Sequence, residues 1–153
     1  MLTLYLDTCS YNRLFDDRSI VKNYLERETI ILILQLAYES KLKIVSSEVL
    51  DVEISVIPDI WRLDHVVSIY NGITTEHIQL GNEHIERAKQ FEKTLNTKPF
   101  DSLHLALAES HADYMITTDQ KLINAAKRSD ILINVDNPIS FIRNEVIDND
   151  TNN

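Results

Sequence analysis

Short apolar segments of strand type alternate with helical segments along most of this chain. Most of the strand-type segments are nearly continuous in apolar side chains, which is typical of parallel strands that are buried on both faces. The expected strands cover residues 2–6, 43–45, 73–80, 114–117 and 131–135. This alternation predicts an α/β fold, in which helices cover both faces of a central, mostly parallel sheet of about five strands.

The segment between the first two strands, residues 20–41, has both strand and helix character. Thr29–Leu34 is rich in β-branched residues, whereas Val21, Leu25, Leu32 and Leu36 keep helical spacing. The length of the segment favours one long helix. A short segment is expected at residues 11–16, and further helices are expected to start at residues 48, 59, 82 or 83, 99, 120 and 137. Asn71-Gly72 is expected to end the helix that starts at residue 59.

The length of 153 residues fits one domain, expected at 1–145, with a disordered tail at 146–153. A single cysteine, Cys9, allows no intramolecular disulfide and fits a reducing compartment. No apolar run is long enough to span a bilayer, and the first residues lack the basic region of a signal peptide. We therefore expect a cytoplasmic protein without a membrane partner.

Four acidic residues occupy corresponding places in this pattern. Asp7, Glu48 and Asp119 follow expected strands, and Asp101 lies in the first turn of the helix that starts at Pro99. The handed crossover rule places every strand-to-helix turn along one edge of the sheet, so these side chains are predicted to converge. Singly, such acids are typical of helix caps. Together they would repel one another unless a cation joined them.

A cluster of carboxylates without His or Cys ligands is the donor set that Mg²⁺ or Mn²⁺ prefers. Such an ion can activate a water for phosphodiester hydrolysis, so no protein nucleophile is required. Cys9 and Ser10 have no His–acid pair to activate them, and the chain has no Gly-rich phosphate loop. A haloacid-dehalogenase-like phosphatase would need a second aspartate where Cys9 stands.

Five segments, taken in order, resemble the PIN-domain family: Leu4–Thr8, Val45–Glu48, Lys98–Ala106, Ile116–Asp119 and Asn137–Phe141. The resemblance covers nearly the whole chain. It implies a three-layer α/β/α sandwich and a metal-dependent endoribonuclease, which in many members is the toxin of a type II toxin–antitoxin pair. It also implies RNA as the substrate, an antitoxin as a partner and, by analogy alone, a homodimer.

The same resemblance assigns roles to individual residues. The catalytic and metal-binding acids would be Asp7, Glu48, Asp101 and Asp119, which would hold one or two Mg²⁺ or Mn²⁺ ions. The supporting polar residues would be Thr8, Ser10, Thr117 and Thr118. Two departures from the family pattern stand out: Cys9 replaces an asparagine that many members carry, and Gln120 replaces a further acid, which bears on a second metal site.

Arg13, Lys98 and Lys121 are candidates for binding the substrate, and Lys127 and Arg128 lie near the same motifs. A single-stranded or looped RNA is favoured over a duplex, because an exposed backbone can enter a narrow groove. The net charge of −9 counts against nucleic-acid binding unless several acids are neutralised by a cation. The alternative hypothesis is a non-catalytic PIN-like module that binds RNA or protein. The nuclease hypothesis requires Glu48 and Asp101 to lie near Asp7.

Overall fold

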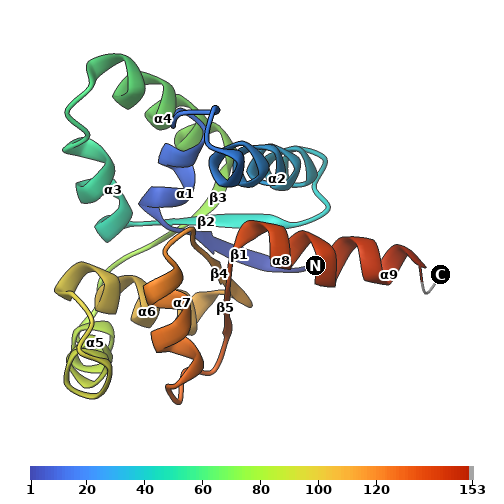
Figure 1. Cartoon of the computed structure of the whole chain (residues 1–153). Coiled ribbons are helices and arrows are strands. Elements are labelled where there is room, and N and C mark those ends of the chain that lie inside the picture. Colours follow the sequence, from blue (N-terminus) through green and yellow to red (C-terminus); the bar gives the residue numbers. More distant parts are fainter. Residues whose placement is uncertain (152–153) are drawn as a thin grey trace.

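The computed structural model describes residues 1–151 and contains a five-stranded sheet in which all neighbouring strands are parallel (Figure 1). The strand order is β3-β2-β1-β4-β5. The strands are β1 (Thr3–Leu6), β2 (Lys43–Ser47), β3 (Thr74–Ile78), β4 (Tyr114–Ile116) and β5 (Asn134–Asp136). The α/β class and the parallel five-stranded sheet expected from the sequence are confirmed.

Helices cover the sheet on both sides. Figure 1 shows α1, α2 and α4 on one face and α5, α6 and α7 on the other, which gives three layers. The helices are α1 (Thr8–Arg13), α2 (Val21–Tyr38), α3 (Glu48–Ser55), α4 (Ile60–Ile73), α5 (Asn82–Leu95), α6 (Pro99–His111), α7 (Gln120–Lys127), α8 (Pro138–Ile142) and α9 (Asp148–Thr151). The long helix expected within residues 20–41 is α2, and α8 packs against it.

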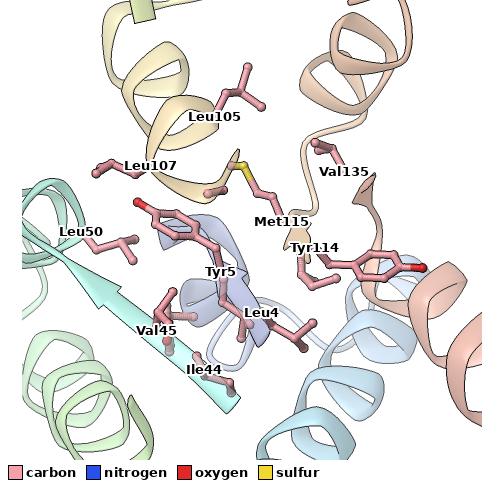
Figure 2. Close-up of a cluster of buried hydrophobic side chains, with 14 of the residues drawn as sticks. Leu4, Tyr5, Ile44, Val45, Leu50, Leu105, Leu107, Tyr114, Met115 and Val135 are labelled. Carbon is pink, nitrogen blue, oxygen red and sulfur yellow. The ribbon is translucent and has the colours of Figure 1, made fainter. Parts of the chain in front are cut away.

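The central strand β1 supplies side chains to both layers of the core. Leu4, Tyr5 and Leu6 are fully buried. Figure 2 shows Leu4 and Tyr5 pointing to opposite sides of the sheet, with the Tyr5 ring directed toward α6. Side chains alternate along a strand, so Asp7, two residues after Tyr5, continues on the α6 side. The packing of β1 therefore places an acid beside α6.

Some element boundaries differ from the sequence prediction. The first short helix is α1, at residues 8–13 rather than 11–16, because Asp7 caps it directly. Helix α4 continues through Gly72, which has no left-handed backbone conformation, and the Thr74 hydroxyl donates to Tyr70 O at its end. Strand β5 starts at residue 134 rather than 131, since Ile131 and Ile133 pack against the core from a loop.

The C-terminal residues 143–151 are helical: a π-helix, η1 (Arg143–Ile147), leads into α9. Val146 packs against the core, and the Tyr114 hydroxyl donates to the carboxylate of Glu145, so tertiary contacts hold η1. Residues 152–153 of the expected tail lie outside the described residues. Among residues 1–151, no helix has the length and apolar character needed to cross a membrane.

Candidate active site

The carboxyl ends of β1 and β4 lie side by side in the middle of the sheet. From β1 the chain proceeds to β2 and β3 on one side, and it later returns to β4 and β5 on the other. Open parallel sheets bind ligands beyond the strand ends at such a switch point. The side chains that follow β1 and β4 are therefore the first candidates for a functional site.

Asp7 follows β1 and is buried, with a relative exposure of 6%. Its Oδ1 accepts hydrogen bonds from the backbone N–H of Ser10 at 3.1 Å and the Ser10 hydroxyl at 3.0 Å. Burial raises the pKa of Asp7, although hydrogen bonds from Cys9 and Thr117 oppose this shift. Ser10 therefore holds the Asp7 carboxylate in place, and the buried carboxylate would gain from a nearby cation.

Cys9 joins the ends of β1 and β4. Its thiol donates to Asp7 Oδ1 at 3.0 Å, lies 3.3 Å from Thr117 Oγ1 and accepts from the Thr118 hydroxyl at 3.1 Å. Burial, together with the charge of Asp7, raises the pKa of Cys9, so this residue is a thiol at neutral pH. Cys9 therefore links the Asp7 carboxylate to the turn after β4 through its protonated thiol.

Asp119 follows β4 and caps α7. Its Oδ1 accepts from the backbone N–H groups of Lys121 at 3.0 Å and Leu122 at 3.2 Å. Thr117 Oγ1 accepts from the Asp119 N–H at 3.1 Å, which fixes the turn after β4. Asp7 and Asp119 are therefore N-caps of helices, and each also lies at the carboxyl end of a strand.

Asp101 lies in the first turn of α6 and is partly buried. Burial raises the pKa of its carboxyl, and the negative charges of Asp119, Asp7 and Glu53 raise it further. These charges come from three other segments of the chain. Asp101 is therefore within electrostatic reach of Asp7, Glu53 and Asp119, and Glu48 is not among these acids.

Glu48 was the wrong choice for the fourth acid. It is the exposed first residue of α3, and the acids that raise the pKa of Asp101 do not include it. Glu53 lies five residues further, about 140° round the helix. Its Oε1 accepts from the Thr8 hydroxyl at 2.7 Å and from His104 Nε2. Thr8 therefore supports Glu53 rather than Asp7.

Helical periodicity could have identified Glu53. The residue lies four positions after Val49 and three after Leu50, both of which are buried on the inner side of α3. Burial opposes ionisation of Glu53, but the hydrogen bond and charge of His104 and the hydrogen bond from Thr8 outweigh it and lower the pKa. Glu53 is therefore ionised at neutral pH.

A groove of about 410 Å³ opens beside Asp101 and Asp119. Three cationic residues also line it: Lys98 before α6, Lys121 in the first turn of α7, and Arg128 just after α7. Lys98 and Lys121 were predicted to lie near the substrate. The groove therefore combines positive charge with direct access to two of the four acids.

Arg13 has a different environment from the one the sequence suggested. Its guanidinium pairs with Asp16 at 3.0 Å and donates to Asn23 at 2.6 Å, and its Nε lies 3.1 Å from Glu26 Oε1. Arg13 is thus an internal ion-pair residue that links α1 to α2. Lys127 lines a separate hollow of about 220 Å³ beside Asp136. Neither residue lines the groove beside the acids.

The donor set of the site consists of carboxylate oxygens, which suits a hard divalent cation. The hydrogen bonds described above use Oδ1 of Asp7, Oδ1 of Asp119 and Oε1 of Glu53. Within residues 1–151, however, no three His, Cys, Asp or Glu side chains are close enough to form a metal site by themselves. An ion that fits here would be one that completes its coordination with water or substrate, as Mg²⁺ commonly does.

Repulsion among these acids predicts how Asp101→Asn changes stability in protein freed of divalent ions. The folded-state pKa of Asp101 is raised, so its contribution to stability is lost as pH rises through that value. We expect the variant to be as stable as the wild type at pH 7, or more stable by up to about 1 kcal/mol, because solvent screens a partly exposed group. The gap should close on acidification.

Urea unfolding between pH 4 and 8 measures this difference. Asp64→Asn, which changes an exposed aspartate of α4, is the matched control. If Asp101→Asn instead loses several kcal/mol at pH 7, the carboxylate is a structural hydrogen-bond acceptor, and repulsion does not govern the site.

The solved structures that are similar to this chain include three toxin–antitoxin complexes, two of which are bound to DNA. The crystal structure of FitAcB from Neisseria gonorrhoeae has a TM-score of 0.58 and 13% identity, covering 89% of this chain and 98% of that one. VapBC2 from Rickettsia felis, bound to a DNA fragment from its promoter, has a TM-score of 0.57 and 17% identity, covering 89% and 98%. FitAB bound to an IR36 DNA fragment has a TM-score of 0.58 and 13% identity, covering 88% of this chain and 94% of that one. No family model and no curated protein matches the sequence.

At these identities the comparisons show the fold alone. This chain has a PIN-like α/β fold, with a parallel sheet between two layers of helices. The resemblance found in the sequence is therefore confirmed at the level of the fold.

Proposed function

We propose that this chain is a divalent-metal-dependent endoribonuclease and acts as the toxin of a toxin–antitoxin pair. The observation that carries the proposal is that burial and the charges of Asp119, Asp7 and Glu53 raise the pKa of Asp101 at the switch point of the sheet. Like charges held together at a ligand-binding edge are a recurrent feature of functional sites. Glu53 takes the part that the sequence assigned to Glu48.

The four acids have one shared part in the proposal, which is to bind a divalent metal ion. Asp7, Glu53, Asp101 and Asp119 would hold Mg²⁺ or Mn²⁺, and a bound ion would supply an activated water and neutralise charge on the phosphate. Gln120 donates to Asn124 along α7 at 2.9 Å, so its amide is engaged away from the acids. This arrangement supports one ion rather than two.

The groove beside Asp101 and Asp119 supports RNA as the substrate. Lys98, Lys121 and Arg128 can neutralise backbone phosphates on either side of the bond that is cut. A single strand suits such a groove, because its backbone is flexible and its bases are accessible. The net charge of −9 is no obstacle, since a bound cation offsets several of the acids at the site.

The partner proposal comes from the similar structures. FitAB and VapBC2 were each solved with DNA, VapBC2 with a fragment from its promoter. We propose that this chain likewise pairs with an antitoxin that binds DNA. The homodimer and the cytoplasmic location that the sequence suggested stay predictions.

Cleavage of a labelled single-stranded RNA by purified protein tests the nuclease proposal. We expect cleavage with Mg²⁺ or Mn²⁺, no cleavage after chelation, and a loss of at least about a hundredfold in Asp101→Asn, since a group that stabilises transition-state charge is removed. Asp64→Asn should cleave like the wild type. Absence of cleavage across varied RNAs, with no Mn²⁺ uptake in calorimetry, would favour the non-catalytic binding module instead.

A further inference from the structure

A continuous line of hydrogen bonds connects the start of α3 to Glu53. The Leu50 N–H donates to Ser47 Oγ at 3.1 Å, and Ser47 Oγ lies 2.9 Å from the Tyr5 hydroxyl. The Tyr5 hydroxyl lies 2.5 Å from His104 Nδ1, and His104 Nε2 contacts Glu53 Oε1. The line thus passes from α3 through β1 and α6 and returns to α3.

This line is closed to solvent except at its end. Ser47 and Tyr5 have no exposed surface, and His104 is 2% exposed. The Glu53 side chain is 28% exposed. Hydrogen bonds are stronger in such surroundings, and an unpaired polar group would be costly. The buried hydrogen bonds therefore fix the position of Glu53, which is the one residue of the line that reaches the site.

The hydrogens in the line can follow a direction in which each hydroxyl donates once. The Leu50 N–H can only donate, so the Ser47 hydroxyl hydrogen is available for Tyr5, and the Tyr5 hydrogen is available for His104 Nδ1. In this direction Nδ1 accepts, and Nε2 carries the hydrogen that it donates to Glu53 Oε1.

We propose that His104 is a positioning residue that holds Glu53 for a divalent cation, and that Tyr5 fixes the orientation of the His104 ring. This inference rests on the proposed function. His104 and Thr8 both donate to Oε1, which leaves Oε2 as the oxygen for the ion. His104 lies three residues after Asp101, so α6 supplies one acid and orients another. Partners that orient a ligand in this way typically change metal affinity by about 10- to 100-fold.

The first experiment is NMR of the imidazole nitrogens in protein freed of divalent ions, so it does not depend on nuclease activity. We expect His104 of the wild type to carry its hydrogen on Nε2, with Nδ1 as an acceptor. In Tyr5→Phe we expect the Nδ1 signal to shift, because the donor to Nδ1 is gone. A hydrogen on Nδ1 in the wild type, or an unchanged His104 signal in Tyr5→Phe, would overturn the assigned direction.

The second experiment is calorimetric titration with Mn²⁺. His104→Leu should bind Mn²⁺ about 10- to 100-fold more weakly than the wild type. His104→Gln, which keeps a donor near the position of Nε2, should recover part of that loss. The control is His84→Gln in α5: His84 is equally buried, but it bonds to Gly81 N and Ser110 Oγ, so Mn²⁺ affinity should not change.

The outcomes separate this inference from the proposed function. If the wild type takes up no Mn²⁺, the nuclease proposal fails, while the NMR experiment still tests the hydrogen-bond line. If the wild type binds Mn²⁺ and His104→Leu binds it equally well, the positioning role is overturned. Should His104→Leu fail to fold, His104→Gln and Tyr5→Phe carry the test, and unchanged Mn²⁺ affinity in both would overturn it.

Discussion

Glu53→Gln is expected to abolish metal-dependent RNA cleavage, whereas Glu48→Gln should leave it at the wild-type level. Glu53 is held at the site by Thr8 and His104, and its charge acts on Asp101. Glu48 is exposed at the start of the same helix. Loss of a charged ligand should lower kcat/KM by at least about a hundredfold, while loss of an exposed carboxylate should change it less than twofold.

The comparison is sharp because the two substitutions are chemically identical and lie in one short helix. The glutamine at position 53 can still accept hydrogen bonds from Thr8 and His104, so the fold should be kept. Equal unfolding midpoints in urea would verify this. A loss of activity in Glu48→Gln with full activity in Glu53→Gln would show that the site is built from Glu48, as the sequence suggested.

Arg13→Met is expected to destabilise the protein by about 3 kcal/mol, because it leaves a buried carboxylate without its main counter-charge. The Glu26 side chain has no exposed surface. Arg13 Nε lies 3.1 Å from its Oε1 without hydrogen-bond geometry, so the attraction is mainly between charges. Lys22 is 3.8 Å away and the Asn137 amide donates to Oε2, but both partners remain after the substitution.

Urea unfolding of the metal-free protein measures this effect. Arg18→Met, an exposed arginine of the loop between α1 and α2, should change stability by less than about 0.5 kcal/mol. The double variant Arg13→Met with Glu26→Leu should recover most of the loss, since the unpaired charge is also removed. If Arg13→Met kept full stability but bound RNA more weakly, Arg13 would be a substrate-binding residue, as first expected.

The residues predicted well from the sequence are those governed by local rules. Asp7 and Asp119 follow buried strands, and the handed crossover sends all such turns to one edge. Asp101 follows Pro99 at the start of α6, and this start lies near the strand ends because α6 runs back to the beginning of β4. Lys98 and Lys121 lie next to these acids in the chain, so they share their location in the groove.

The residues predicted wrongly depend on helix orientation and packing. Glu48 directly follows β2, as Asp119 follows β4, but the rotation of α3 turns Glu53 inward instead. Arg13 is close to Asp7 in sequence, yet α1 directs it toward α2, where the buried Glu26 attracts it. Proximity along the chain did not determine the face on which either side chain lies.

The sequence by itself determined the alternation of strands and helices, the parallel sheet and the edge at which the acids gather, because backbone handedness and apolar periodicity are local properties. Only the tertiary structure decided which glutamate joins that edge and that His104 and Tyr5 hold it there. These contacts join residues that lie 51 to 99 positions apart in the chain. They form when α3, β1 and α6 pack together, and no local pattern encodes how those three elements are rotated.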